Sequence, residues 1–150
     1  MDPVDALRAC YAFEGVPDRQ LRELAQLSEI RDFATGDTVI EQKEVSSQMY
    51  VVLEGEAAMI GTDGEPIVRF KPGTIFGEMA LVAGIPRSAT IKTTEETRVA
   101  QIYAAPVLAM MDNDPRLGYT ISSNLARLLC HRLIETNEYI DGISGKPETD

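Results

Sequence analysis

The 150-residue sequence has few of the residues that build metal centres and disulfide scaffolds. It contains two cysteines, one histidine and no tryptophan. Two thiols are too few for a disulfide scaffold or for the four thiolates of an iron–sulfur cluster. Metal-dependent cupin enzymes need a cluster of histidines, which His131 alone cannot supply. We therefore expect no metal and no resident cofactor, and we expect Cys10 and Cys130 to be core thiols.

Long hydrophobic runs and positive charge are also scarce. No run approaches the roughly 18 apolar residues that span a bilayer. The N-terminus lacks the basic and apolar regions of a signal peptide, so the sequence predicts a cytoplasmic protein without a membrane partner. The formal net charge of −10 repels phosphate backbones, and direct binding to nucleic acid is therefore not expected. An anionic small ligand would need positive charge placed locally.

The chain is long enough for one domain, and its hydrophobic content of 44% is ordinary for a globular core. Helical spacing recurs at both ends. Asp18 is expected to cap one helix, and Asn113-Asp114-Pro115 to begin another with a cap and a proline at its first position. The pattern predicts a single domain at 1–140 and a tail: N-terminal helices at 1–32, strands at 33–104, C-terminal helices at 105–140 and a flexible tail at 141–150.

The central segment contains about seven or eight short strands at intervals of roughly ten residues. Turn residues separate them, and Asp63-Gly64 is a hairpin signal. This pattern predicts a fold that is mainly β, a double-sheet antiparallel β-roll of the jelly-roll kind. The roll would be flanked by N-terminal helices and by a long C-terminal helix.

The stretch from Phe76 to Ile91 interrupts the strands with residues that suit an anion. Gly77 and Gly84 bracket Glu78–Ala83, which can form one or two turns of helix. The first amides of such a helix have no intrahelical partners, and a flanking glycine allows a ligand to approach them closely. This segment therefore predicts a pocket with free amides from Glu78 to Ala80.

Two charged residues in the same stretch specify the ligand further. Arg87 supplies a planar guanidinium that can hold two phosphate oxygens, and Ser88 adds a hydroxyl beside it. The carboxylate of Glu78 is an acceptor and would repel a phosphate, so we expect it to accept the hydroxyl of an adjacent sugar. The combination predicts a compact nucleotide.

This stretch resembles the phosphate-binding cassette of the cyclic nucleotide-binding domains, the sensor modules of catabolite activator protein, protein kinase A regulatory subunits and nucleotide-gated channels. The matching residues are Phe76-Gly77-Glu78, Ala80-Leu81 and Arg87-Ser88-Ala89-Thr90. The resemblance implies that Arg87 binds the cyclic phosphate and that Glu78 binds the ribose 2′-hydroxyl. It implies these ligand-binding positions: Phe76, Gly77, Glu78, Met79, Ala80, Arg87, Ser88, Ala89, Arg132, Thr136 and Asn137.

The chain departs from the family pattern in one loop and in the segment after the domain. Gln42-Lys43-Glu44 stands where the family usually has a turn glycine, so we expect this loop to have a different shape. A larger pocket there would admit a cyclic dinucleotide. Transcription factors of the family continue into a DNA-binding helix-turn-helix, and these 150 residues contain none.

The long C-terminal helix carries an apolar stripe with two interpretations: Ile121, Leu125, Leu128, Leu129, Leu133 and Ile140. The stripe packs against its own roll, or part of it forms the seam of a homodimer. By resemblance to catabolite activator protein, Arg132 pairs with Glu78, and Thr136 or Asn137 meets the purine.

The residues and the resemblance together predict a non-catalytic sensor of a cyclic purine nucleotide that signals to an effector protein by moving its helices. Ser88 favours cAMP over cGMP by analogy with the family. The main alternative is a degenerate member that serves only as an interaction or dimerisation scaffold. A phosphodiesterase is less favoured because its chemistry calls for a metal cluster.

Overall fold

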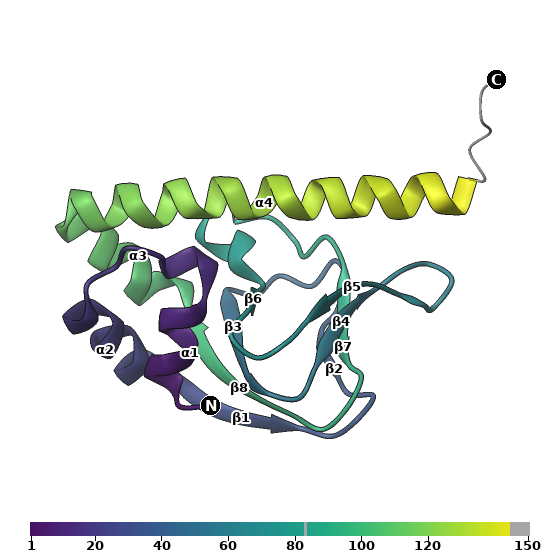
Figure 1. Ribbon diagram of the computed structural model, residues 1–150, viewed down its shortest axis with the longest axis horizontal. Coiled ribbons are helices and arrows are strands. Elements are labelled where there is room, and N and C mark those ends of the chain that lie inside the picture. The colour runs from purple at the N-terminus through teal and green to yellow at the C-terminus, as the bar shows by residue number, and fades with distance from the viewer. Residues whose placement is uncertain (83, 145–150) are drawn as a thin grey trace.

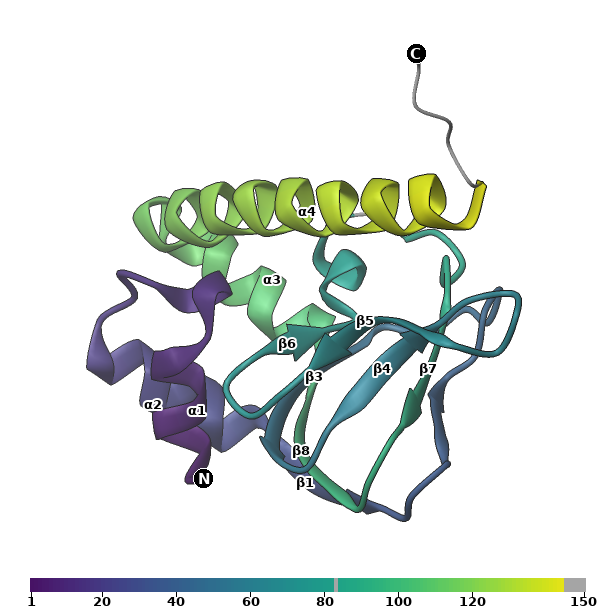
Figure 2. The same cartoon turned by 45° about the vertical axis from the view of Figure 1, so that its right-hand side comes forward.

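The computed structural model describes residues 1–82 and 84–144. Two four-stranded antiparallel sheets face each other, in the orders β1-β8-β3-β6 and β2-β7-β4-β5 (Figures 1 and 2). The strands of the described residues are β1 (Glu29–Phe33), β2 (Thr38–Ile40), β3 (Gln48–Glu54), β4 (Ala57–Ile60), β5 (Pro66–Phe70), β6 (Ile75–Phe76), β7 (Thr90–Thr93) and β8 (Thr97–Tyr103). The predicted double-sheet roll is confirmed.

Helices cover one side of the roll. Their bounds are α1 (Pro3–Ala9), η1 (Tyr11–Phe13), α2 (Asp18–Leu27), η2 (Glu78–Leu81), α3 (Ala104–Asn113) and α4 (Pro115–Ser144), where η denotes a 3₁₀ helix. In Figure 1, α4 runs across the top of the molecule, over α3 at one end and over the roll at the other. The predicted N-terminal helices and long C-terminal helix are thus present.

Strand β3 separates two hydrophobic cores because its side chains alternate between the faces of its sheet. Met49 and Val51 are fully buried against the helical layer. Tyr50 and Val52 point into the roll, where the Tyr50 ring stacks on the Phe76 ring at a centroid distance of 5.2 Å. The roll interior is therefore lined with apolar side chains before any ligand is considered.

The first half of α4 is fixed to the helical layer. Ile121 and Leu125 are buried in the core that faces the helices. The side-chain amide of Asn124 donates to the carbonyl oxygens of Ala12 and Glu14 at 3.1 and 2.8 Å. These contacts set the direction in which α4 leaves the helical layer and crosses the roll.

Three predicted boundaries are wrong. Strand β1 begins at Glu29, inside the segment 1–32 that was predicted to be helical, because it pairs in register with β8. Asp18 is the first residue of α2 and Pro17 occupies the N-cap position. Helix α4 continues through residues 141–144 of the predicted tail, since one glycine in a long helix costs only about 1 kcal/mol. Residues 145–150 of that tail lie outside the described residues.

Two other local expectations were met and one was not. The carboxylate of Asp114 accepts from the amides of Arg116 and Leu117 at 3.1 and 3.3 Å, and Pro115 opens α4. Cys10 is buried, and burial raises the pKa of its thiol to about 11. Cys130 is exposed, so only one of the two cysteines is the core thiol that was expected.

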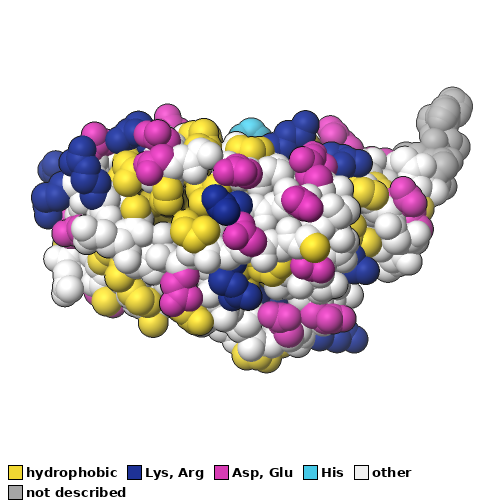
Figure 3. Space-filling view, turned by 90° about the horizontal axis from the view of Figure 1, so that it is seen from below, with side chains coloured by type: hydrophobic (Ala, Val, Ile, Leu, Met, Phe, Trp, Pro, Cys, Tyr) yellow, Lys and Arg dark blue, Asp and Glu magenta, His cyan; other side chains and the backbone are white. Residues whose placement is uncertain are grey.

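The surface mixes both signs of charge. On the face shown in Figure 3, Lys and Arg side chains are interspersed with Asp and Glu side chains. Among the described residues, no helix combines the length and the apolar character needed to cross a membrane.

Candidate functional site

The candidate site begins at Gly77, directly after the end of β6. This residue has φ +77°, in the left-handed region that glycine adopts without strain. A Cβ here would lie 3.1 Å from the Gln48 carbonyl oxygen and 3.4 Å from a terminal nitrogen of Arg87. Glycine therefore lets the chain turn sharply while the Arg87 guanidinium approaches its backbone.

The helix after Gly77 is at the short end of the predicted one or two turns. It is a single 3₁₀ turn, Glu78–Leu81, anchored by the buried side chain of Leu81; residue 83, at the end of the predicted helix, lies outside the described residues. The amide of Ala80 donates to the Gly77 carbonyl oxygen at 3.3 Å. The expectation of a free amide at Ala80 is therefore wrong, because a 3₁₀ helix closes its first hydrogen bond one residue earlier than an α-helix.

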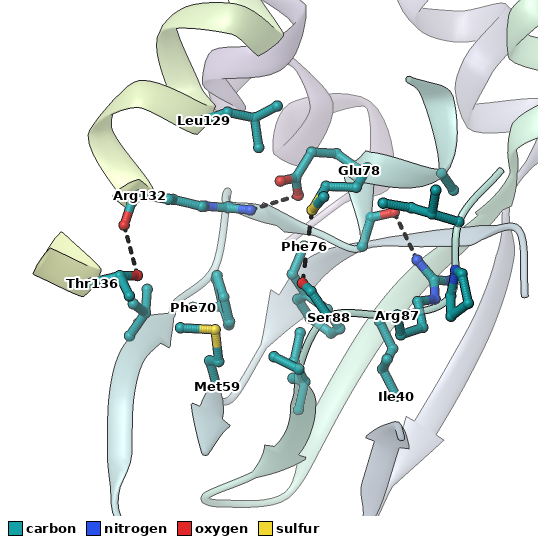
Figure 4. Close-up of a pocket in the computed structure, with 18 of the residues that line it drawn as sticks. Ile40, Met59, Phe70, Phe76, Glu78, Arg87, Ser88, Leu129, Arg132 and Thr136 are labelled. Carbon is teal, nitrogen blue, oxygen red and sulfur yellow. Dashed lines mark hydrogen bonds and ion pairs between the residues drawn. The ribbon is translucent and has the colours of Figure 1, made fainter. Parts of the chain in front are cut away.

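A cavity of about 410 Å³ lies between this turn, the roll interior and α4 (Figure 4). Its volume is in the range of small-molecule sites. Polar side chains enter it from the cassette and from α4, whereas strands supply an apolar wall. That wall consists of Ile40, Met59, Val68, Phe70, Phe76 and Ile91.

Arg87 is a buried cation at one end of the cavity, with 8% of its surface exposed. Its Nε donates to the Ser46 hydroxyl at 2.8 Å, one terminal nitrogen donates to the Gly77 carbonyl at 3.1 Å, and the other donates to the Gln48 carbonyl. Three of the five guanidinium N–H groups are thus used. Burial lowers the pKa of Arg87 from its usual value because desolvation disfavours the cation, so a bound anion would be favourable.

Arg132 extends from α4 toward Glu78, and the two form a buried ion pair (Figure 4). A terminal nitrogen of Arg132 lies 2.5 Å from Glu78 Oε1, and the two side chains are 19% and 3% exposed. Arg132 also donates to the Ile75 carbonyl and lies over the Phe70 ring, 4.9 Å from its centroid. The predicted pair is confirmed, and it joins α4 to the cassette.

The cavity brings together ten of the eleven predicted ligand-binding positions. Thr136 lies on its α4 side and donates its hydroxyl proton to the Arg132 carbonyl at 2.9 Å. Asn137 is exposed and is not among the lining residues. One residue along an α-helix turns the side chain by about 100°, so Asn137 points away where Thr136 points in. The positions that line the cavity are Phe76, Gly77, Glu78, Met79, Ala80, Arg87, Ser88, Ala89, Arg132 and Thr136.

Sequence reasoning missed the part of the site that comes from distant elements. Ser46 and the apolar wall apart from Phe76 were not predicted, although alternation in the strands indicates which side chains point inward. Leu129 and Leu133 were assigned to the stripe of the long helix, and both line the cavity.

The loop that departs from the family pattern keeps a glycine-like turn. Lys43 has φ +77°, so the left-handed conformation is retained without a glycine. Its amide donates to the Arg87 carbonyl, and the Arg87 amide donates to the Glu44 carbonyl, both at 2.8 Å. The loop folds against the cassette instead of opening the cavity.

The arrangement can bind an anion at Arg87, a hydroxyl at Glu78 and a flat apolar group along the strand wall. Among residues 1–82 and 84–144, no group of three His, Cys, Asp or Glu side chains could hold a metal ion.

Comparisons with known proteins agree with this description. The family model for the cyclic nucleotide-binding domain matches residues 30–114. A cyclic nucleotide-gated potassium channel of Rhizobium etli is 30% identical over 109 residues, which are 73% of this chain and 30% of the channel. A cAMP-dependent protein kinase regulatory subunit of Mycosarcoma maydis is 31% identical over 93 residues, which are 60% of this chain and 18% of the subunit.

A solved structure shows a similar fold over most of the chain. The catabolite activator protein of Thermus thermophilus matches with a TM-score of 0.70 and 25% identity, over 89% of this chain and 63% of that one. The chain spans less than a third of the length of either curated relative named above.

Proposed function

This chain belongs to the cyclic nucleotide-binding domain family, and on that premise we propose that it is a non-catalytic sensor whose ligand is cAMP. The observation that carries the proposal is that one cavity of about 410 Å³ is lined by both a buried cation, Arg87, and a buried carboxylate, Glu78. A cyclic nucleotide presents the complementary groups, a singly charged phosphate next to a ribose hydroxyl. The proposal includes a cytoplasmic location and an effector protein that receives the signal.

Arg87 is the residue proposed to bind the phosphate. After its three bonds to the protein, one N–H on each terminal nitrogen remains. Ser88 lines the same end of the cavity, and its hydroxyl makes only a weak contact with the Met79 sulfur at 3.9 Å. Arg87 can therefore donate its two unused N–H groups to phosphate oxygens, and the Ser88 hydroxyl can turn to them at small cost.

Glu78 is the residue proposed to bind the ribose. Oε1 is held by Arg132, which keeps the carboxylate at the cavity and leaves Oε2 as an acceptor for the 2′-hydroxyl. An accepting carboxylate discriminates strongly against a sugar without that hydroxyl, because a buried charged acceptor would lose its partner.

Thr136 is the proposed base contact. Its proton is committed to the Arg132 carbonyl, so the hydroxyl oxygen offers only lone pairs to a base. A lone pair accepts from the exocyclic amine of adenine and repels the carbonyl oxygen at the same place in guanine. This polarity supports cAMP over cGMP. The relative named for cAMP dependence agrees with that choice.

A cyclic dinucleotide is less well supported. The Gln42-Lys43-Glu44 loop makes two backbone hydrogen bonds with Arg87, donating one and accepting the other. The Glu78–Arg132 pair holds α4 over the cavity. A second nucleotide would have to break one of these contacts.

The proposal is tested by isothermal titration of the purified chain with cAMP, cGMP, cyclic di-GMP and 5′-AMP, repeated with Thr136→Val. We expect cAMP to bind most tightly and the preference over cGMP to shrink about fivefold in the variant, the value of one neutral hydrogen bond. No heat with any of the four, in folded protein free of carried-over ligand, would favour the scaffold alternative. Formation of 5′-AMP with a divalent metal would contradict a non-catalytic role.

We further propose that the outer half of α4 forms a homodimer seam. Leu133, Ile140 and Ile143 are 60%, 53% and 58% exposed, although all three are large and apolar. With Leu129 and Thr136 they follow alternating steps of four and three residues, the spacing of a coiled coil. The stripe read from the sequence thus divides. Its first half is buried in its own domain, and its second half passes from the cavity, which Leu129 and Leu133 line, to the exposed Ile140.

Charge on this seam should separate the dimer. We expect the double variant Ile140→Asp/Ile143→Asp to be monomeric by light scattering at concentrations at which the original chain is dimeric, because burying two carboxylates per helix is costly. Ile134→Asp is the matched control, since Ile134 is 55% exposed but lies off the seam. A monomeric original chain, or a dimer that survives the double change, would contradict the proposal.

A further inference from the structure

The loop that precedes β3 is bonded to the arginine of the cassette by more than its backbone. Arg87 Nε donates to the Ser46 hydroxyl at 2.8 Å, and that hydroxyl donates to Glu44 Oε2 at 2.7 Å. The other oxygen of Glu44 accepts from the Glu41 amide at 2.9 Å. A continuous chain of hydrogen bonds therefore runs from the loop backbone to the guanidinium.

The direction of these bonds is determined by the number of protons. Ser46 has one hydroxyl proton, which it donates in the hydrogen bond to Glu44. The serine oxygen therefore presents its lone pairs to the N–H of Arg87 Nε. The Ser46 hydroxyl is the main reason that the pKa of Glu44 lies below its usual value. Glu44 thus remains an anion at neutral pH and polarises the serine toward the cation.

Ser46 differs in kind from the other partners of Arg87. The two terminal nitrogens donate to the carbonyl oxygens of Gly77 and Gln48. Within the described residues, the hydrogen bond at Nε is the only one that the Arg87 guanidinium makes to a side chain. It anchors the Nε edge of the group. Without it, the guanidinium is held at its two terminal nitrogens alone, so its Nε edge can tilt relative to the cavity.

The loop holds this geometry at a cost. Lys43 adopts a left-handed conformation that a non-glycine residue takes with strain of roughly 1 kcal/mol. Such strain persists where the surroundings require it. Here the two backbone hydrogen bonds between this loop and Arg87 hold Lys43 in that conformation.

We propose that Ser46, oriented by Glu44, is the positioning residue that sets the plane of the Arg87 guanidinium for an incoming phosphate. This inference rests on the proposed function for its ligand but not for its geometry. Ser46 acts through Arg87, and its effect should appear both in the empty protein and in ligand discrimination.

The first test needs no ligand. In the purified chain, the NMR signal of the Arg87 Nε–H group, assigned by its loss in Arg87→Lys, should exchange slowly with water. We expect Ser46→Ala to accelerate that exchange at least tenfold and Ser46→Thr, which keeps the hydroxyl, to restore slow exchange. Ser47→Ala changes a neighbouring exposed serine and serves as the matched control.

The second test measures discrimination. In the two diastereomeric phosphorothioates of cAMP, sulfur replaces one or the other of the two exocyclic phosphate oxygens, which are the oxygens proposed to face Arg87. We expect Ser46→Ala to weaken cAMP binding about tenfold, the value of one hydrogen bond to a charged group, and to reduce the ratio of affinities for the two diastereomers. In an Arg87→Lys background, Ser46→Ala should add less than twofold.

Each outcome separates the two proposals. Unchanged Nε–H exchange and an unchanged diastereomer ratio in Ser46→Ala would overturn the positioning role even if cAMP binds tightly. Fast exchange in Ser46→Ala without nucleotide binding to the original chain would uphold the positioning of Arg87 and overturn the proposed function.

Discussion

Arg87→Ala is expected to weaken cAMP binding by tens- to thousands-fold, which corresponds to about 2–5 kcal/mol. Arg87 is nearly buried, and a phosphate bound there would be desolvated together with it. Removal of the guanidinium would leave the anion without its partner and would leave the Gly77 and Gln48 carbonyls without a donor. Titration calorimetry measures the first effect, and urea unfolding measures the second.

Two further variants make this result specific. Arg87→Lys keeps the charge but loses the planar fork, so we expect it to recover only part of the affinity. Arg98→Ala is the matched control, because Arg98 is half-exposed and forms a surface ion pair with Asp32. If Arg87→Ala binds cAMP within threefold of the original chain, the phosphate does not lie at Arg87.

Glu78→Ala is expected to cost about 3–5 kcal/mol of the free energy of unfolding, since it leaves Arg132 as an uncompensated, largely buried charge. Arg132→Ala should cost a comparable amount for the same reason. The double variant should cost clearly less than the sum, with a coupling energy of about 2 kcal/mol. Urea unfolding of the four proteins measures this cycle, and additive costs would show that the pair does not act as a unit.

The same variant tests the role of Glu78 toward the ribose. The original chain should bind 2′-deoxy-cAMP at least tenfold more weakly than cAMP, because Glu78 loses the hydroxyl that it accepts. In Glu78→Ala that difference should disappear. An equal preference for the 2′-hydroxyl in both proteins would place the ribose elsewhere in the cavity.

Residues close together in the sequence were the most predictable part of the site. Gly77, Glu78, Arg87 and Ser88 lie within twelve positions, and their chemistry already specified an anion beside a hydroxyl. Strand existence was predictable for a similar reason, because alternation and turn residues act over a few positions.

Errors arose where tertiary contacts overrode a local signal. Residues 29–32 form a strand because β8 offers a partner edge, although the preceding helix favoured its own continuation. Gly142 is helical because it lies within a helix of thirty residues that begins in the core.

The chemistry of the cassette could be read from the sequence alone, whereas its surroundings depend on the tertiary structure. Ser46 and Arg87 are 41 residues apart, and Glu78 and Arg132 are 54 apart. No local pattern specifies such pairs. The orientation of α4 selected Thr136 over Asn137, and the strand wall came from positions in both sheets. Side-chain chemistry is a property of each residue, but a cavity exists only when distant segments pack around the same space.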